Sequence, residues 1–229
     1  MVVVAQLVEL PPVARKVAGS CPVDHPNIVL SSAGIKIKNH KICGMILCME
    51  REIEVKAKID DFHVLIKKLE SLGCKISGPI SQYDYIYNQN GIDLGKTHET
   101  PVLRIREQGD RIIFTYKQNI SGELDCLEKE LDVSNGKTIR EIIGMLGYSK
   151  SVEVEKIRRK TKYKELEICL DEVKELGFFI EVEKMTDDMN DNGQKMQEEL
   201  FDFLESIGVS KKNKMSQGYD SMIYEKNSK

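Results

Sequence analysis

Charged and apolar side chains alternate in the stretch Glu52-Ile53-Glu54-Val55-Lys56. In a β-strand, side chains two residues apart lie on the same face. The three charged residues therefore share one face, and the apolar ones share the other. The two-residue period extends over 50–59, which predicts a strand with one charged face and one apolar face.

The same period recurs along the rest of the chain. It predicts further strands at 81–88, 102–107, 111–118, 127–133, 152–163, 165–170 and 178–185. A turn at Gln108-Gly109-Asp110 joins two of these strands into a hairpin. A polar loop that contains Gly91, Gly95 and Pro101 precedes that hairpin.

Apolar residues at helical spacing predict three helices, over 62–72, after Asn135-Gly136 and over 194–207. Asp60-Asp61 offers an N-cap to the first helix, and Asp187-Asp188-x-x-Asp191 is expected to cap the third. Gly73 ends the first helix. The second helix carries one apolar face, formed by Ile139, Ile142, Ile143 and Leu146. The lysine cluster at 211–214 leads into a short C-terminal segment.

Some eight strands, mostly joined by hairpins, and a few helices indicate an α+β fold. Its antiparallel sheet is expected to be closed into a barrel or strongly curved. The 229 residues suffice for one large domain or two small ones.

Composition excludes several classes of protein. Charged residues make up 31% of the chain and the net charge is −3, which argues against a generally basic nucleic-acid binder. The six cysteines include no C-x-x-C pair, so a zinc site or a disulfide framework is not expected, and isolated thiols favour a reducing cytoplasm. No run is long and apolar enough to span a bilayer, so no membrane partner is expected.

Residues 1–49 differ from the rest of the chain. They contain almost no acids, carry prolines at 11, 12, 22 and 26, and show no sustained period. The segments 4–10 and 15–22 resemble sequence found in spurious reading frames across transfer-RNA genes. We therefore expect 1–49 to be non-native or disordered and without a role in function. Residues 50–229 are expected to form the functional domain.

The charged faces of the predicted strands are sorted by sign. Basic rows contain Arg104 and Arg106, and Lys156, Arg158 and Lys160, whereas acidic rows contain Glu128 and Glu130, and Glu181 and Glu183. One such row alone is typical of a solvated strand. On the outside of a sheet, however, acids and bases are expected to intersperse and pair. With these faces inward, a hydrated tunnel that binds a metal–polyphosphate complex would offset the cost of burying the charges.

The chain resembles the CYTH superfamily, which includes class IV adenylyl cyclases, thiamine triphosphatases and inorganic triphosphatases. The motif Glu52-x-Glu54-x-Lys56 matches the N-terminal signature of that family, and the resemblance covers 50–225 in order. Further matching motifs are Gln82-Tyr-Asp84-Tyr-Ile-Tyr87, Leu103-Arg104-Ile-Arg106, Thr115-Tyr-Lys117, Glu128-x-Glu130, Lys156-x-Arg158 and Asp171-Glu-Val-x-x-Leu176-Gly177-x-Phe179-x-Glu181-x-Glu183. The last of them is most similar to the class IV cyclase branch.

The resemblance implies a triphosphate tunnel, an eight-stranded antiparallel β-barrel with charged faces inward. It implies that Mg²⁺ or Mn²⁺ is bound by Glu52, Glu54, Glu181 and Glu183, with Asp171, Glu128 and Glu130 as further acidic candidates. The triphosphate, either ATP or another small triphosphate, would be held by Lys56, Arg104, Arg106, Lys117, Lys156 and Arg158. Lys56 and Arg158 are the expected catalytic residues. A homodimer is also compatible with the resemblance.

Two positions depart from the family pattern. Cys126-Leu127 stands where an arginine often precedes the central acidic pair, and Ser216-Gln-Gly-Tyr219 replaces an adjacent Ser-Tyr near the C-terminus. The second departure leaves open the role of Tyr219 and of the helix that closes the family's domain.

Three functions stay open at this point. The favoured one is cyclisation of ATP to cyclic AMP and pyrophosphate. The second is hydrolysis of an inorganic or organic triphosphate, which needs the same metal and cation clamp. The third is a non-catalytic polyphosphate or nucleotide binder. Nucleic-acid binding through the lysines at 211–214 is not expected, because a short lysine run is typical of a solvated turn.

Overall fold

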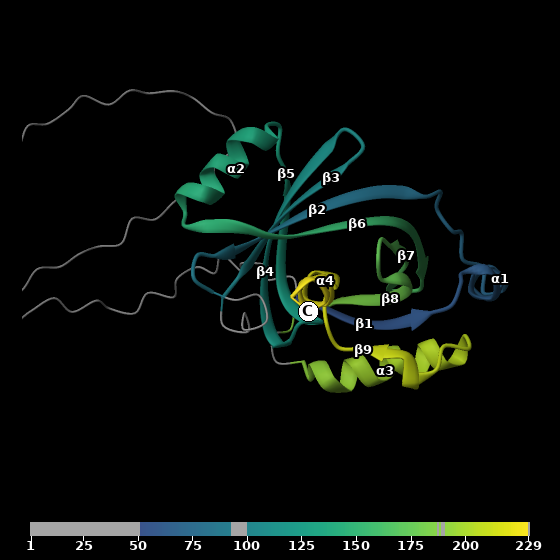
Figure 1. Cartoon of the computed structure of the whole chain (residues 1–229). Helices are drawn as coiled ribbons and strands as arrows, with labels where there is room; N and C mark the ends of the chain where they lie inside the picture. Colours follow the sequence, from purple (N-terminus) through teal and green to yellow (C-terminus); the bar gives the residue numbers. More distant parts are fainter. Residues whose placement is uncertain (1–50, 93–99, 187, 189–190, 229) are drawn as a thin grey trace, which may run out of the picture. The chain divides into compact units, whose positions relative to one another are not determined.

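The structure is a computed structural model, and it describes residues 51–92, 100–186, 188 and 191–228 (Figure 1). The expectation for residues 1–49 falls outside these ranges. So do Gly95 of the predicted loop and Asp187 of the predicted cap.

Eight antiparallel strands close into a barrel. They run in the order β1, β5, β4, β3, β2, β6, β7, β8, and β8 pairs with β1 again. The bounds are β1 (Arg51–Ile59), β2 (Ile80–Gln89), β3 (Val102–Gln108), β4 (Arg111–Gly122), β5 (Asp125–Asp132), β6 (Tyr148–Tyr163), β7 (Leu166–Val173) and β8 (Gly177–Thr186). A short strand β9 (Lys214–Met215) pairs with β1 beyond the segment that β5 occupies. The predicted fold class, an eight-stranded antiparallel barrel flanked by helices, is confirmed.

Several strands extend further than their pattern predicts. β4 continues past residue 118 to Gly122, and β6 begins at Tyr148 rather than at 152. The added residues include Asn119, Ser149 and Lys150, which are polar and lack the alternation that marks a half-buried strand. Backbone pairing with neighbouring strands, which periodicity does not report, holds them in the barrel.

The described residues contain four α-helices, α1 (His63–Ser71), α2 (Gly136–Met145), α3 (Gly193–Ser206) and α4 (Tyr219–Asn227), and one short 3₁₀ helix, η2 (Lys211–Asn213). Gly73 follows α1 with a φ of 85°, a conformation that costs glycine little, so the helix ends there. Asn135 caps α2 by accepting a hydrogen bond from the Thr138 backbone N–H. None of these helices has the length and apolar character needed to cross a membrane.

The predicted N-cap of α3 is wrong among the described residues. Asn192 caps this helix by accepting from the Lys195 N–H at 3.1 Å. The carboxylate of Asp191 instead accepts a hydrogen bond from the Thr186 hydroxyl at 2.5 Å. Asn192 is the residue next to the helix, and asparagine serves as an N-cap as well as aspartate does.

The main apolar core lies outside the barrel, between its outer face and the helices α1 and α3. The apolar row of β1 enters this core with Ile53, Val55 and Ala57. Leu65 and Leu69 of α1 and the residues Leu200, Phe201 and Leu204 of α3 cover it. Figure 1 shows α3 running along the outside of the barrel beside β1. Because β1 alternates, this burial of its apolar face directs the charged face into the barrel.

Only two of the four apolar residues predicted to face the core from the second helix, α2, do so. Ile143 is fully buried in a cluster with Leu103 and Ile105, and Ile139 packs against that cluster. Ile142 and Leu146, however, are 44% and 65% exposed. Of the predicted apolar face of α2, only Ile139 and Ile143 therefore pack against the barrel.

Candidate active site

The inner face of the barrel encloses a cavity of about 430 Å³. Eleven acidic and eight basic residues are among the described residues that line it. They include every residue that the sequence predicts for the site except one: Glu52, Glu54, Lys56, Arg104, Arg106, Lys117, Glu128, Glu130, Lys156, Arg158, Glu181 and Glu183. The exception, Asp171, lies behind the lining and is fully buried.

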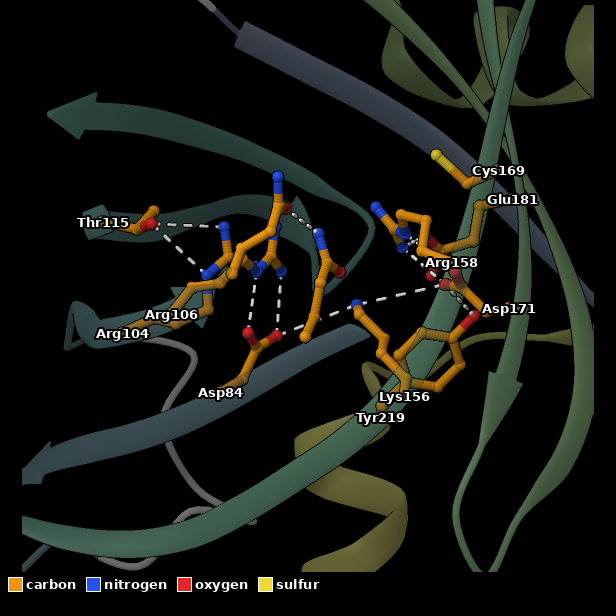
Figure 2. Close-up of polar contacts among 12 residues, drawn as sticks. Asp84, Arg104, Arg106, Thr115, Lys156, Arg158, Cys169, Asp171, Glu181 and Tyr219 are labelled. Atoms are coloured by element: carbon orange, nitrogen blue, oxygen red, sulfur yellow. Dashed lines mark hydrogen bonds and ion pairs between the residues drawn. The ribbon is translucent and has the colours of Figure 1, made fainter. Parts of the chain in front are cut away.

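Basic and acidic side chains form a line across four strands (Figure 2). On β3, Arg106 donates to Asp84 of β2 through two hydrogen bonds of 2.7 and 2.8 Å. Lys156 of β6 lies 3.8 Å from Asp84 and 3.9 Å from Asp171 of β7. Arg158 of β6 then donates to both carboxylate oxygens of Asp171, through Nε and Nη2 of its guanidinium group. Three cations thus face the cavity with a carboxylate between each neighbouring pair.

Lys56 of β1 is a buried residue of the cavity wall. Its ammonium group is 3.3 Å from Glu54 and 3.1 Å from Glu181. Burial opposes the charge of Lys56, but these two carboxylates outweigh burial and raise its pKa. Glu181 also accepts from Arg158. Although burial opposes ionisation, Lys56 and Arg158 hold the pKa of Glu181 well below its usual range.

Arg104 forms a second basic centre on β3. It donates to Glu128 and Glu130 of β5 at 2.8 Å each. Lys117 of β4 lies 3.4 Å from Glu128. Despite burial, Arg104 and Lys117 lower the pKa of Glu128 to about 2. These pairs follow from register, because Arg104 faces Thr115, which in turn faces Glu130.

A group of carboxylates without such strong partners lies between these centres. Glu52, Glu54 and Glu183 each place an oxygen within 4.8 Å of the others. Burial, together with the charges of Glu128 and Glu183, raises the pKa of Glu52 well above its usual range. Burial raises the pKa of Glu183 to about 7, although Arg158 opposes the shift. A divalent cation would relieve this crowding of like charges, and carboxylate oxygens suit Mg²⁺ or Mn²⁺.

Two buried thiols lie next to the cluster formed by Glu52, Glu54 and Glu183. Cys126 is grouped with Glu52 and Glu128, and Cys169 with Glu167 and Glu183. Burial raises the pKa of both thiols, so both are uncharged at neutral pH. Cys126 therefore leaves the acidic wall without the positive charge that an arginine would bring.

Tyr219, the first residue of α4, closes part of the tunnel wall. Its hydroxyl donates to Asp171 at 3.0 Å. The ammonium groups of Lys56 and Lys156 lie 4.1 and 5.0 Å from the centre of its ring. In addition, Lys56 donates to the backbone carbonyl of Gln217, so the segment before α4 is tied to the site. These contacts give Tyr219 a place in the wall that the sequence alone left open.

Sequence reasoning missed Asp84 as a residue of the site. It lines the cavity and is 4% exposed, between Arg106 and Lys156. Its signal was present, because Gln82, Asp84 and Ile86 share one strand face. That face carries only one charge, however, so it did not stand out as a charged row. The partners of Asp84 become visible only from the register of β2 with β3 and β6.

Comparison with known proteins identifies the family of this chain. The model of the CYTH domain matches residues 50–219. A protein of Methanocaldococcus jannaschii named "Putative adenylate cyclase" is 31% identical over 170 residues, which cover 73% of this chain and 95% of that protein.

Solved structures agree with the fold. The PH1819 protein of Pyrococcus horikoshii matches with a TM-score of 0.65 and 26% identity over 76% of this chain and 99% of that chain. A Hippeastrum protein, described as a "putative adenylyl cyclase" with a dominant triphosphatase activity, matches with a TM-score of 0.52 and 16% identity. That match covers 78% of this chain and 96% of the Hippeastrum chain, and at this identity it shows likeness of fold alone.

Proposed function

Because this chain belongs to the CYTH domain family, whose members are metal-dependent triphosphate tunnel enzymes, we propose that it converts ATP to cyclic AMP and pyrophosphate. In this reaction the ribose 3′ oxygen of ATP attacks the α-phosphorus, and pyrophosphate leaves. One observation supports the proposal most. The same cavity holds a cluster of three carboxylates suited to a divalent cation and, beside it, a row of cations suited to a polyphosphate.

Glu52, Glu54 and Glu183 would hold the metal, Mg²⁺ or Mn²⁺. Their oxygens lie close together, and the side chain of Glu52 takes part in no ion pair or hydrogen bond within the described residues. Glu181, Glu128 and Glu130 line the same cavity but already face lysine or arginine. A divalent cation bound there would neutralise charge on the phosphate oxygens during the transfer.

The basic residues would bind and orient the triphosphate. Arg106, Lys156 and Arg158 offer a row of donors, and arginine forks match the geometry of phosphate oxygens. Lys56 and Arg158 are the proposed catalytic residues because both border the metal carboxylates. Lys56 is 3.3 Å from Glu54, and Arg158 is 3.8 Å from Glu183. In such phosphoryl chemistry, positioning and charge neutralisation supply most of the rate increase.

Hydrolysis of a triphosphate is the second candidate. Tyr219 is the only aromatic residue among the described lining residues, and its ring already faces two lysines. The described wall therefore has no free aromatic surface on which a purine could stack, which favours a substrate without a base.

A non-catalytic polyphosphate binder is the third candidate. Such a protein would gain nothing from the cluster of Glu52, Glu54 and Glu183, because clustered carboxylates repel an anion unless they carry a metal ion. The presence of this carboxylate cluster therefore favours an enzyme over a non-catalytic binder.

Product analysis of the full chain separates the three candidates. The protein is incubated with ATP and, separately, with tripolyphosphate, each with Mg²⁺ or Mn²⁺, and the products are identified by chromatography. Cyclic AMP with pyrophosphate is the expected result for ATP. Orthophosphate release, above all from tripolyphosphate, would contradict the cyclase proposal and support the triphosphatase. Binding of triphosphate without turnover would overturn both enzymatic proposals.

A further inference from the structure

Asp84 uses both of its carboxylate oxygens inside the protein. Arg106 occupies one oxygen at 2.7 Å and the other at 2.8 Å. Although burial opposes ionisation, Arg106 and Lys156 hold the pKa of Asp84 well below its usual range. The carboxylate is therefore charged and bound at neutral pH. Asp84 also belongs to none of the groups of described residues that could hold a metal ion.

Asp171 stands in the same relation to Arg158. It is fully buried and accepts from Arg158 and from the Tyr219 hydroxyl. Lys156 lies between Asp84 and Asp171, under 4 Å from each. Figure 2 shows the resulting order Arg106, Asp84, Lys156, Asp171, Arg158, in which positive and negative charges alternate.

We infer that Asp84 and Asp171 are positioning residues, which hold Arg106, Lys156 and Arg158 as a preset anion-binding face and do not bind metal. This inference rests on the proposed function, because the face is assigned to the triphosphate. The sequence groups Asp171 with the metal ligands, and the inference moves it to the cation side of the tunnel. The structure thus divides the acids of the tunnel into two sets with different tasks.

Electrostatics explains why the face needs these two carboxylates. Three cations on neighbouring strands repel one another, and burial removes the water that would screen them. A carboxylate between each pair offsets the repulsion and fixes the planes of the two guanidinium groups through paired hydrogen bonds. The donors then face the cavity before the ligand arrives, so the entropic cost of ordering these side chains on binding is smaller.

The test compares Asp84→Asn with the wild-type full chain. The variant keeps the size of the side chain but removes the charge that holds Arg106 and Lys156. The dissociation constant for tripolyphosphate, measured by calorimetry with saturating Mg²⁺, should rise about tenfold to hundredfold, the loss typical of a buried charge-assisted hydrogen bond. The affinity for Mn²⁺ alone, measured by electron paramagnetic resonance, should stay within about twofold of wild type, a margin smaller than the effect of removing a metal-site partner.

Asp132→Asn is the matched control. Asp132 binds Arg111 by the same two-pronged geometry, at 3.0 Å for each bond, but this pair is exposed at the ends of β4 and β5 and does not line the cavity. Its loss should leave both affinities unchanged. Asp84→Glu keeps the charge and guards against a folding failure in Asp84→Asn. It should bind tripolyphosphate better than Asp84→Asn does.

A double variant tests whether Asp84 acts through its partner. If it does, Asp84→Asn combined with Arg106→Gln should weaken tripolyphosphate binding by less than the sum of the two single losses, the remainder acting through Lys156. Fully additive losses would overturn the inference, as would an unchanged tripolyphosphate affinity in Asp84→Asn. A fall in Mn²⁺ affinity in Asp84→Asn would make Asp84 a metal ligand instead. By contrast, a wild-type chain that binds Mn²⁺ but no triphosphate would refute the proposed function itself.

Discussion

At the scale of single residues, neighbours decide what each carboxylate in the tunnel can do. Glu181 and Glu183 are two residues apart on β8 and point into the same cavity. Lys56 and Arg158 outweigh burial and keep Glu181 charged, whereas burial raises the pKa of Glu183 to about 7. In the sequence both are simply acids of one charged row. Only the register of β8 with β1 and β7 separates a paired acid from one available to a cation.

Glu54→Gln should remove metal binding and leave the fold intact. The substitution keeps the shape of the side chain but replaces a carboxylate of the group formed with Glu52 and Glu183. Mn²⁺ affinity should fall at least about tenfold, since loss of even an outer partner of a metal ligand costs that much. Electron paramagnetic resonance of free Mn²⁺ measures the affinity, and circular dichroism measures the fold.

Glu153→Gln is the control for Glu54→Gln. Glu153 lies on β6 with its side chain 58% exposed, paired with Lys150. Its replacement should change neither Mn²⁺ affinity nor turnover. Unchanged Mn²⁺ affinity and unchanged kinetics in Glu54→Gln would contradict the proposed metal site.

At the scale of elements, the alternation of side chains predicts a strand well where one face of the strand meets an apolar core and the other meets a charged cavity. β1 and β8 each carry apolar residues into the outer core and charged residues into the tunnel, so their two-residue period is strong. The helix α4 lacked such a signal. It is nine residues long, and Tyr219 and Ile223 are its buried apolar contacts, with Met222 and Tyr224 partly buried beside them. Its position depends on polar contacts with residues distant in sequence, which no local period reports.

Tyr219→Phe tests how α4 is attached to the barrel. The hydroxyl that donates to Asp171 is lost, while the ring remains beside Phe179. The free energy of unfolding should fall by about 1.5–3 kcal/mol, the usual worth of a hydrogen bond to a charged group. Urea denaturation measures this change.

Tyr83→Phe provides the comparison for that measurement. Tyr83 lies on the outer face of β2 and is 46% exposed. Loss of its hydroxyl should change the free energy of unfolding by less than about 0.5 kcal/mol, as surface substitutions usually do. Equal effects of the two substitutions would mean that the Asp171 contact does not hold α4.

At the scale of the whole molecule, the fold separates stability from chemistry. The main apolar core lies between the barrel and the helices, and the interior of the barrel is left to charged groups. The general arrangement could be predicted from rows of like charge, because burying them requires a hydrated, ligand-binding interior. The pairing of individual charges could not, because Arg104 with Glu128 or Arg158 with Asp171 depends on how strands align across the closed sheet.

The charge of the tunnel predicts that a triphosphate binds only together with a metal ion. Eleven acids and eight bases line the described wall, so the wall is net negative before any ligand enters. A polyanion is therefore repelled unless a divalent cation first neutralises part of the wall. Calorimetric titration of tripolyphosphate should give a dissociation constant at least about tenfold larger in EDTA than in Mg²⁺, a difference of about 1.4 kcal/mol. Sodium chloride at matched ionic strength serves as the control for screening.

Thermodynamic linkage also predicts the reciprocal effect, that of tripolyphosphate on metal affinity. Whatever factor Mg²⁺ or Mn²⁺ adds to the affinity for tripolyphosphate, tripolyphosphate must add to the affinity for that cation. Mn²⁺ titrations with and without tripolyphosphate, corrected for complexes formed in free solution, should therefore return the factor that calorimetry finds for Mn²⁺. Equal tripolyphosphate affinity in EDTA and in Mn²⁺ would mean that the basic face of Arg106, Lys156 and Arg158 overrides the net charge of the wall. The carboxylate group of Glu52, Glu54 and Glu183 would then have no part in binding the substrate.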